Sequence, residues 1–231
     1  MPVRRELIVA IDGPSGAGKS SVTARLAERL GYLHIDTGAM YRALALMVSR
    51  AGVVVEDDEA VQRVCQGAVI SFRRAEGGYR VLVNGEDVSL AIRTPEISLL
   101  TSRLASRKVV RDLLLVQQRA MGAEGGVVLE GRDIGTVVFP EAEVKFFLTA
   151  SVEERGRRRY EELRLKGESV TLEQTIAEVA QRDAQDRSRE HAPLKRADDA
   201  IDVDSTGRSI EQVLDAMLQV VAERRAAKCA G

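Results

Sequence analysis

A glycine-rich segment near the start of the chain carries residue types suited to holding an anion. Residues 13–20 read Gly-Pro-Ser-Gly-Ala-Gly-Lys-Ser and match G-x-x-x-x-G-K-[ST] at every fixed position. The glycines allow a turn whose N–H groups face inward, Lys19 can reach β- and γ-phosphates, and the Ser20 hydroxyl can ligate Mg²⁺. An apolar stretch at 7–11 precedes the motif and a helical pattern follows it, as the motif requires. The residues predicted to bind the triphosphate are Gly13, Pro14, Ser15, Gly16, Ala17, Gly18, Lys19, Ser20 and Ser21.

Charged residues elsewhere point to a second anion site. Arg132 and Asp133 lie between two glycines, directly after an apolar run at 126–130. Ligands bind at the carboxyl ends of strands in open parallel sheets, which favours a site here over a charged turn. Arg182, Asp186 and Arg189 recur at spacings of four and three, so they share one helix face.

A third group of cations lies at Arg155, Arg158 and Arg159, just before a loop at 166–169. Two arginine-bearing helices joined by a loop could close over phosphates and exclude water, as a kinase requires. The alternative is a solvated charged face. The pattern leaves open which of the three arginines enters the site.

The elements that must position these residues alternate between strand and helix. Apolar runs predict strands at 7–11, 33–35, 126–130, 144–148 and 200–203, and helical patterns occupy 20–30, 38–50, 95–121 with a break near 106, and 210–225. Serine or threonine three residues before Glu or Gln predicts capping boxes at 151, 171 and 209, and Thr37 fits the N-cap of the second helix. This alternation indicates an α/β fold with a central parallel β-sheet flanked by helices. Strand-and-turn patterns at 68–90 add a small antiparallel insert, with turns at 77–78 and 84–85.

Composition narrows the class of protein. The 231 residues carry 34 basic and 35 acidic side chains, a net charge of −1, which argues against a polymeric nucleic acid partner. Of the basic residues 28 are Arg, the cation suited to binding phosphate in a planar fork. The apolar run at 7–11 is too short for a signal peptide or a membrane span, so we expect a cytoplasmic protein. The guanine-reading N-K-x-D motif of a GTPase and the Leu-Ser-Gly-Gly signature of a transporter ATPase are both missing from the sequence.

Taken with the phosphate loop, further motifs resemble the bacterial cytidylate kinases over nearly the whole chain. These motifs are Asp36-Thr-Gly-Ala-Met-Tyr-Arg42, Asp87-Val-Ser89 with Ile92-Arg-Thr94, the segment from Gly131 to Pro140, and Ala192-Pro-Leu194. The resemblance implies a monomeric P-loop kinase with a helical lid that transfers the γ-phosphoryl of ATP to CMP or dCMP with Mg²⁺. It implies a single domain with a core at 1–36, 123–150 and 197–231, a monophosphate-binding part at 37–122 and a lid at 151–196.

The same resemblance implies a role for each matching residue. Arg42, Arg132 and Arg189 would hold the phosphate of the monophosphate; Ser102, Arg111 and Asp133 would read the cytosine; Arg182 and Asp186 would contact the ribose; Asp36 and Thr37 would shape the acceptor pocket. The residues expected to act in catalysis are Lys19, Arg132, Arg159, Arg182 and Arg189. Ser20 stands where glycine also occurs in the family, and Glu130 stands where a magnesium-binding aspartate is the usual residue.

Such a reaction needs little covalent help from the protein. The acceptor phosphate is already an anion at neutral pH, so catalysis consists of aligning two repelling anions and offsetting their charge. This fits a chain with only two histidines, and we interpret His34 as strand filler. Two alternatives remain at this stage: another small-molecule P-loop kinase, and a nucleotide-binding regulator that transfers no phosphate.

Overall fold

A computed structural model describes residues 6–75 and 78–230 of the chain. By its contacts the chain divides into two compact units, one formed by residues up to 34 together with 125 onwards, the other by residues 35–124. Each unit is described in turn.

The central sheet explains why the predicted phosphate loop and strand-end residues occur where they do. Within the described residues it has five strands in the order β2 (Leu33–Asp36), β6 (Val127–Gly131), β1 (Ile8–Asp12), β7 (Val144–Thr149) and β8 (Ile201–Asp204). β1 pairs in parallel with both β6 and β7, and β7 pairs in parallel with β8. Every residue of β1 and β6 is buried, as their unbroken apolar pattern predicts. The predicted parallel sheet is therefore confirmed.

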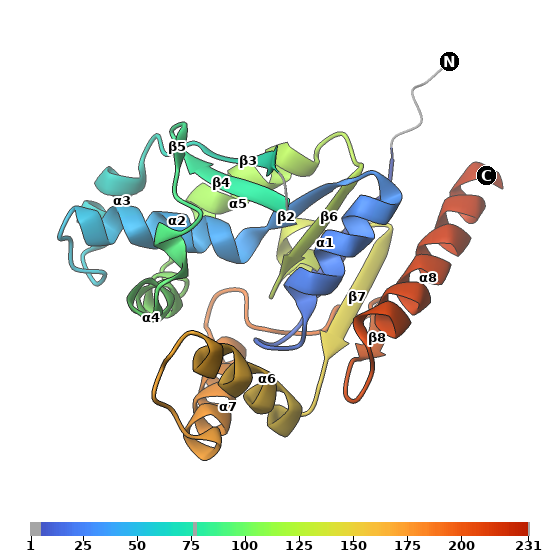
Figure 1. Ribbon diagram of the computed structural model, residues 1–231. Coiled ribbons are helices and arrows are strands. Elements are labelled where there is room, and N and C mark those ends of the chain that lie inside the picture. Colours follow the sequence, from blue (N-terminus) through green and yellow to red (C-terminus); the bar gives the residue numbers. More distant parts are fainter. Residues whose placement is uncertain (1–5, 76–77, 231) are drawn as a thin grey trace. The chain divides into compact units, whose positions relative to one another are not determined.

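One face of this sheet is covered by α1 (Lys19–Leu30) and α8 (Ile210–Ala230), which lie side by side in Figure 1. Their apolar stripes meet the strands in a single core. Its members include Val22 and Leu26 of α1, Met217 and Val221 of α8, and Val9, Ile11, Phe146 and Leu148 of the strands. This packing fixes the start of α1, and with it the phosphate loop, against the ends of β1 and β7.

Two helices that pack against each other extend the first unit: α6 (Val152–Leu165) and α7 (Leu172–Ser188). They approach closely at Gly156, where an added Cβ would lie 2.4 Å from Ile176 Cγ1. The predicted capping boxes at 171 and 209 are complete. The one predicted at 151 is half formed: Ser151 Oγ accepts from Glu154 N–H, but the Ser151 N–H donates to Thr206 Oγ1.

The second unit contains the predicted antiparallel insert. β3 (Ile70–Ala75), β4 (Gly78–Val83) and the short β5 (Glu86–Asp87) form a three-stranded sheet. Asn84 and Gly85 both adopt positive φ, 50° and 87°, which confirms the predicted turn. The turn predicted at 77–78 falls partly on residues outside those described.

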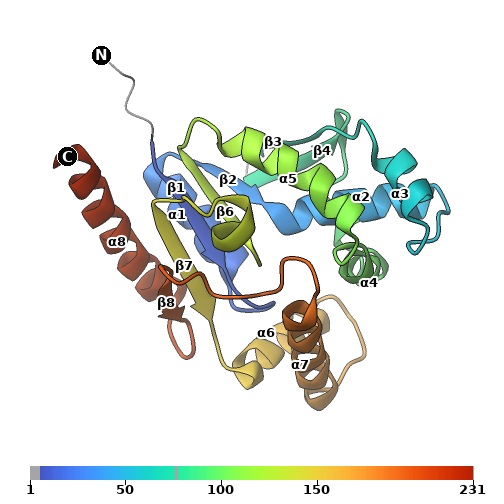
Figure 2. The same ribbon diagram turned by 180° about the vertical axis from the view of Figure 1, so that it is seen from behind.

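Helices complete this unit: α2 (Thr37–Arg50), α3 (Asp58–Cys65), the 3₁₀ turn η1 (Ala91–Arg93), α4 (Pro95–Leu104) and α5 (Lys108–Gly122). The break between α4 and α5 confirms the one predicted near 106. Figure 2 shows α5 beside β3, where Gln117 accepts from Ile70 N–H and donates to the Ala68 carbonyl. Sequence patterns missed α3, because eight residues give too few turns for a clear apolar period.

No helix among the described residues combines the length and apolarity needed to cross a membrane.

Candidate active site

The phosphate loop has the shape that its glycines predict. Gly13, Gly16 and Gly18 all adopt positive φ. A Cβ on Gly13 would lie 2.0 Å from the Leu148 carbonyl oxygen, so only glycine lets the loop pass this close to β7. Lys19 is 7% exposed and its ammonium donates to the Pro14 carbonyl at 2.7 Å, across the mouth of the loop. Burial, together with the charge of Arg132, lowers the pKa of Lys19 to about 7.

Glu130, at the end of β6, reaches the loop from the neighbouring strand. Ser20 Oγ donates to its Oε2 at 2.8 Å, and the carboxylate is buried. A hydroxyl and a carboxylate are the hard oxygen donors that Mg²⁺ prefers, and Mg²⁺ usually takes one or two protein ligands beside nucleotide phosphates and water. Among the described residues, three or more His, Cys, Asp or Glu side chains nowhere gather as a metal cluster. The Ser20 hydroxyl and the Glu130 carboxylate therefore fit a nucleotide-bound magnesium ion.

Asp12, at the end of β1, ties the phosphate loop to the predicted acceptor segment. Its carboxylate accepts from the N–H groups of Ile134 and Gly135 at 2.8 and 2.7 Å. These residues open η2 (Ile134–Val138), a single π-helical turn that sequence patterns did not predict. The bonds hold the turn that follows Asp133, itself 6% exposed, at the carboxyl end of β6. Burial raises the pKa of Asp12 to about 7, against the two N–H donors that lower it.

Three predicted side chains of the second anion site converge on one another. The Asp186 carboxylate accepts from Arg132 Nε at 2.7 Å and from Arg189 Nη2 at 2.5 Å. The Asp186 side chain is 1% exposed, while those of Arg132 and Arg189 retain 20% and 11%. Arg132 and Arg189 hold the pKa of Asp186 below its usual value despite burial. Each guanidinium has further N–H groups with which to meet a phosphate. Arg189 is the residue directly after α7, and Arg182 lies two turns earlier on the same helix.

The arginines of α6 differ in their surroundings. Arg155, 2% exposed, donates to the Ser15 carbonyl of the phosphate loop at 3.1 Å and makes two bonds to Asp183 of α7. Arg159 pairs with Glu162 on its own helix, and its side chain is 37% exposed. Arg155 and Arg159 therefore differ in their surroundings: the side chain of Arg155 is buried and that of Arg159 is partly exposed. The predicted catalytic role of Arg159 stays a prediction.

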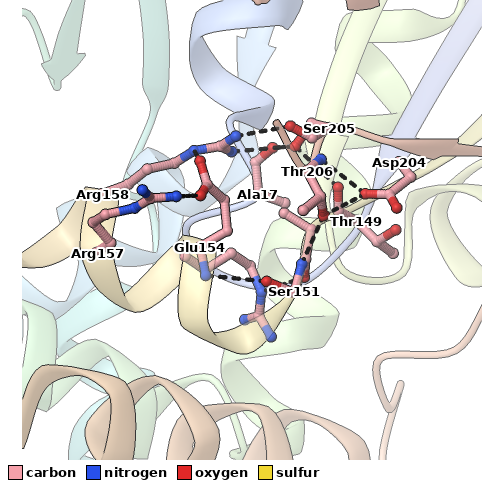
Figure 3. Close-up of polar contacts among 11 residues, drawn as sticks. Ala17, Thr149, Ser151, Glu154, Arg157, Arg158, Asp204, Ser205 and Thr206 are labelled. Atoms are coloured by element: carbon pink, nitrogen blue, oxygen red, sulfur yellow. Dashed lines mark hydrogen bonds and ion pairs between the residues drawn. The ribbon is translucent and has the colours of Figure 1, made fainter. Parts of the chain in front are cut away.

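Arg158 is linked to the loop through Ser205 (Figure 3). Its guanidinium donates to Ser205 Oγ at 3.1 Å and to the Ser205 carbonyl at 2.8 Å, and Ser205 Oγ in turn donates to the Ala17 carbonyl. A Cβ on Gly18 would lie 3.7 Å from Arg158 Nη1. Arg155 and Arg158 are therefore the two arginines of α6 whose side chains meet or approach the phosphate loop.

The remaining predicted residues belong to the second unit. Asp36 caps α2 by accepting from Ala39 N–H, and Arg42 donates to the same carboxylate at 2.8 Å. Thr37, expected at the N-cap, is instead the first helical residue, because Asp36 directly before it takes the N–H bond. Arg111 of α5 lies over the Tyr41 ring at 5.6 Å and donates to the Ala105 carbonyl. Ser102 lies in α4.

Asp12, Glu130 and Asp183 have no assigned role in the predicted site, and Arg155 is one of the three lid arginines that the pattern leaves open. Asp12 directly precedes the glycine-rich motif and Glu130 ends an apolar run, so each had a positional signal. Asp183 had none, since an acidic residue in a charged helix is ordinarily solvated.

Comparisons with known proteins agree with this geometry. The family model "Cytidylate kinase" matches residues 9–223. A cytidylate kinase of Geobacter sulfurreducens is 65% identical, covering 97% of this chain and 96% of that protein. A cytidylate kinase of a Geobacillus species is 47% identical over 96% of this chain and 99% of its own. Among solved structures, a gluconokinase from Sinorhizobium meliloti has a TM-score of 0.50 at 15% identity, covering 96% and 94% of the two chains, a likeness of fold alone.

Proposed function

Because the chain belongs to the cytidylate kinase family, and is a nucleoside monophosphate kinase that phosphorylates CMP or dCMP with ATP, we propose how its residues divide this task. Residues 13–21 bind the triphosphate of ATP, with Lys19 on the β- and γ-phosphates. Arg132 and Arg189 bind the acceptor phosphate together with Arg42. The convergence of Arg132 and Arg189 on Asp186 carries this proposal, because a buried carboxylate pre-orients two guanidinium groups near the phosphate loop's end of the sheet.

The chemistry then rests on charge and alignment. An anionic acceptor oxygen needs no general base, and the anionic phosphate groups of donor and acceptor must be brought together against their repulsion. Fixed positive charge offsets the negative charge that develops on the migrating phosphoryl group. The side chains proposed to supply it are Lys19, Arg132, Arg182 and Arg189, with Arg159 from α6. Arg132 and Arg189 need not reorganise at the moment of transfer, because Asp186 already holds both of them.

We propose that Mg²⁺ accompanies ATP and is held by the Ser20 hydroxyl, with Glu130 as the carboxylate behind it. When bound, the ion neutralises charge on the β- and γ-phosphates. The support is the 2.8 Å bond between Ser20 Oγ and Glu130 Oε2, which places both oxygens at the loop.

Base selection is proposed for the acceptor side. Asp133 accepts from the cytosine amino group and Arg111 donates to N3 or O2, with Ser102 as a third contact. Arg182 and Asp186 contact the ribose, and Asp36 and Thr37 shape the pocket. Asp36 supports this role by holding Arg42 at 2.8 Å.

In this proposal, helices α6 and α7 form the lid and residues 37–122 form the monophosphate-binding part. The chain acts as a cytoplasmic monomer on small nucleotides, without a nucleic acid polymer or membrane partner.

A substrate panel tests the assignment. ATP with CMP, dCMP, UMP or AMP is assayed for the diphosphate product. Phosphorylation of CMP or dCMP well above UMP and AMP supports the proposed base contacts, and equal rates with UMP contradict them. Light scattering at micromolar concentration tests the monomer.

A further inference from the structure

We propose that His34 is a positioning residue for magnesium: acting through Glu130, it holds the Ser20 hydroxyl in the orientation that a nucleotide-bound Mg²⁺ requires. The inference rests on the proposed role of Ser20 as a magnesium ligand. It gives a function to a buried histidine whose sequence pattern indicates only strand filler.

The geometry is a chain of three side chains from three elements. His34 lies in β2 and Glu130 in the adjacent strand β6, so their side chains can meet across the sheet. His34 Nε2 is 2.9 Å from Glu130 Oε1, and Ser20 Oγ is 2.8 Å from Glu130 Oε2. The histidine and glutamate side chains are 11% and 4% exposed. Each carboxylate oxygen thus has its own partner.

The donor and acceptor roles follow from the chemistry of the groups. An ionised carboxylate only accepts, so the Ser20 hydroxyl donates a hydrogen bond to Oε2, and the Nε2–H tautomer of His34 donates one to Oε1. A hydroxyl whose proton is committed in this way keeps its lone pairs for a cation. The bond to Glu130 Oε2 therefore directs the Ser20 proton away from the cation and leaves the oxygen facing it.

His34 is what fixes the plane of that carboxylate. The last torsion of a glutamate is broad, so a carboxylate held at one oxygen can rotate. A second bond at the other oxygen removes this freedom. Outer partners of metal ligands commonly matter by about 10–100-fold in metal affinity or activity. A leucine at position 34 would fill the same buried space but would leave Glu130 without this bond.

Substitutions of His34 distinguish a role in positioning Glu130 from a role in packing alone. His34→Leu removes the donor, His34→Gln keeps an N–H near the Nε2 position, and His34→Asn keeps an amide that is too short to reach. We expect His34→Leu and His34→Asn to raise the Mg²⁺ concentration for half-maximal activity about tenfold. His34→Gln should stay near wild type, and the KM for CMP should move little in all three. The Gln and Asn variants carry the test if the Leu variant fails to fold.

The Ser20→Gly background provides the matched control. If His34 acts only through the Ser20 hydroxyl, His34→Leu should change the magnesium requirement of the Ser20→Gly enzyme by no more than about twofold. An effect of His34→Leu that is equally large in both backgrounds overturns the proposal.

A second readout is independent of turnover. Calorimetric titration should show that His34→Leu weakens binding of ATP in the presence of Mg²⁺ and leaves ATP binding with a chelator unchanged. The wild-type chain has two histidines, His34 and His191, so its imidazole resonances are readily assigned. Adding Mg²⁺ with ATP should shift the His34 ring signals more than metal-free ATP does. Equal weakening with and without Mg²⁺, or equal shifts, overturns the proposal.

The Ser20→Gly variant alone tests the metal role of Ser20 separately from the positioning role of His34. A magnesium requirement unchanged by Ser20→Gly refutes the proposed metal role of Ser20, and with it the role of His34. A requirement raised by Ser20→Gly but untouched by His34→Leu and His34→Asn refutes the inference about His34 alone.

Discussion

The buried ion pair between Arg155 and Asp183 should hold α6, α7 and the phosphate loop together. The guanidinium makes two bonds to Asp183, at 3.0 and 2.6 Å, and one each to the Ala150 and Ser15 carbonyls. The side chains of Arg155 and Asp183 are 3% and 6% exposed. Asp183→Ala would therefore leave a buried cation with only its two carbonyl partners.

The expected loss is large because the charge stays buried. Bonds to charged groups contribute about 1.5–3 kcal/mol each, and two are removed. Breaking one side of a buried ion pair costs about 3–5 kcal/mol, which agrees. For a chain of this length that is a fall in Tm of roughly 6–20 °C. The double variant Arg155→Met/Asp183→Leu should regain most of this loss, since it removes both charges and keeps apolar volume.

Urea unfolding of the wild type and Asp183→Ala gives this loss, and the cycle of Arg155→Met, Asp183→Leu and the double variant gives the coupling free energy. Asp112→Ala is the matched control, because the pair of Asp112 with Lys108 is an exposed i,i+4 pair, with side chains 58% and 66% exposed. It should cost less than about 0.5 kcal/mol. If Asp183→Ala costs no more than this control, or if the coupling is near zero, the ion pair does not hold the helices.

Three further variants or measurements test the site. Burial lowers the pKa of Lys19 to about 7, and a bound triphosphate should raise this pKa, so ATP binding near pH 7.5 should take up protons. The calorimetric binding enthalpy should then depend on the ionisation enthalpy of the buffer. A binding enthalpy that is the same in all buffers would contradict this. Gly156→Ala would place a Cβ 2.4 Å from Ile176 Cγ1 and should cost about 1–3 kcal/mol in urea unfolding; an unchanged midpoint would refute the close crossing. Asp133→Ala should lose CMP activity and reduce the preference for CMP over UMP in kcat/KM, because each buried polar group left unpaired costs about 1–3 kcal/mol. A variant that keeps the full preference for CMP would show that Asp133 does not read the base.

Local signals predicted much of the fold. The strand at 7–11, the phosphate loop, the Asn84–Gly85 turn and the capping boxes at 171 and 209 each depend on residues within a few positions of one another. Because the interacting residues are close in sequence, local patterns are enough to predict these features. The same holds for the alternation of strands and helices that indicates a parallel sheet.

Local competition was harder to predict. Both Asp36 and Thr37 suit an N-cap, and the structure uses Asp36, which also binds Arg42. The three arginines at 155, 158 and 159 look alike in sequence. Only the direction of each side chain from α6 distinguishes them, and that depends on how the helix packs.

Partners that lie far apart in sequence were decided by tertiary structure. Glu130 meets Ser20 and His34 because β6 lies between β1 and β2 in the sheet, an order that alternating strands and helices do not specify. Asp183 meets Arg155 because α6 and α7 pack closely at Gly156. The residue types and spacing were sufficient to identify a nucleotide-binding kinase. The pairing of its buried charges was not, because the free energy of a buried charge depends on partners that only the folded chain brings within reach.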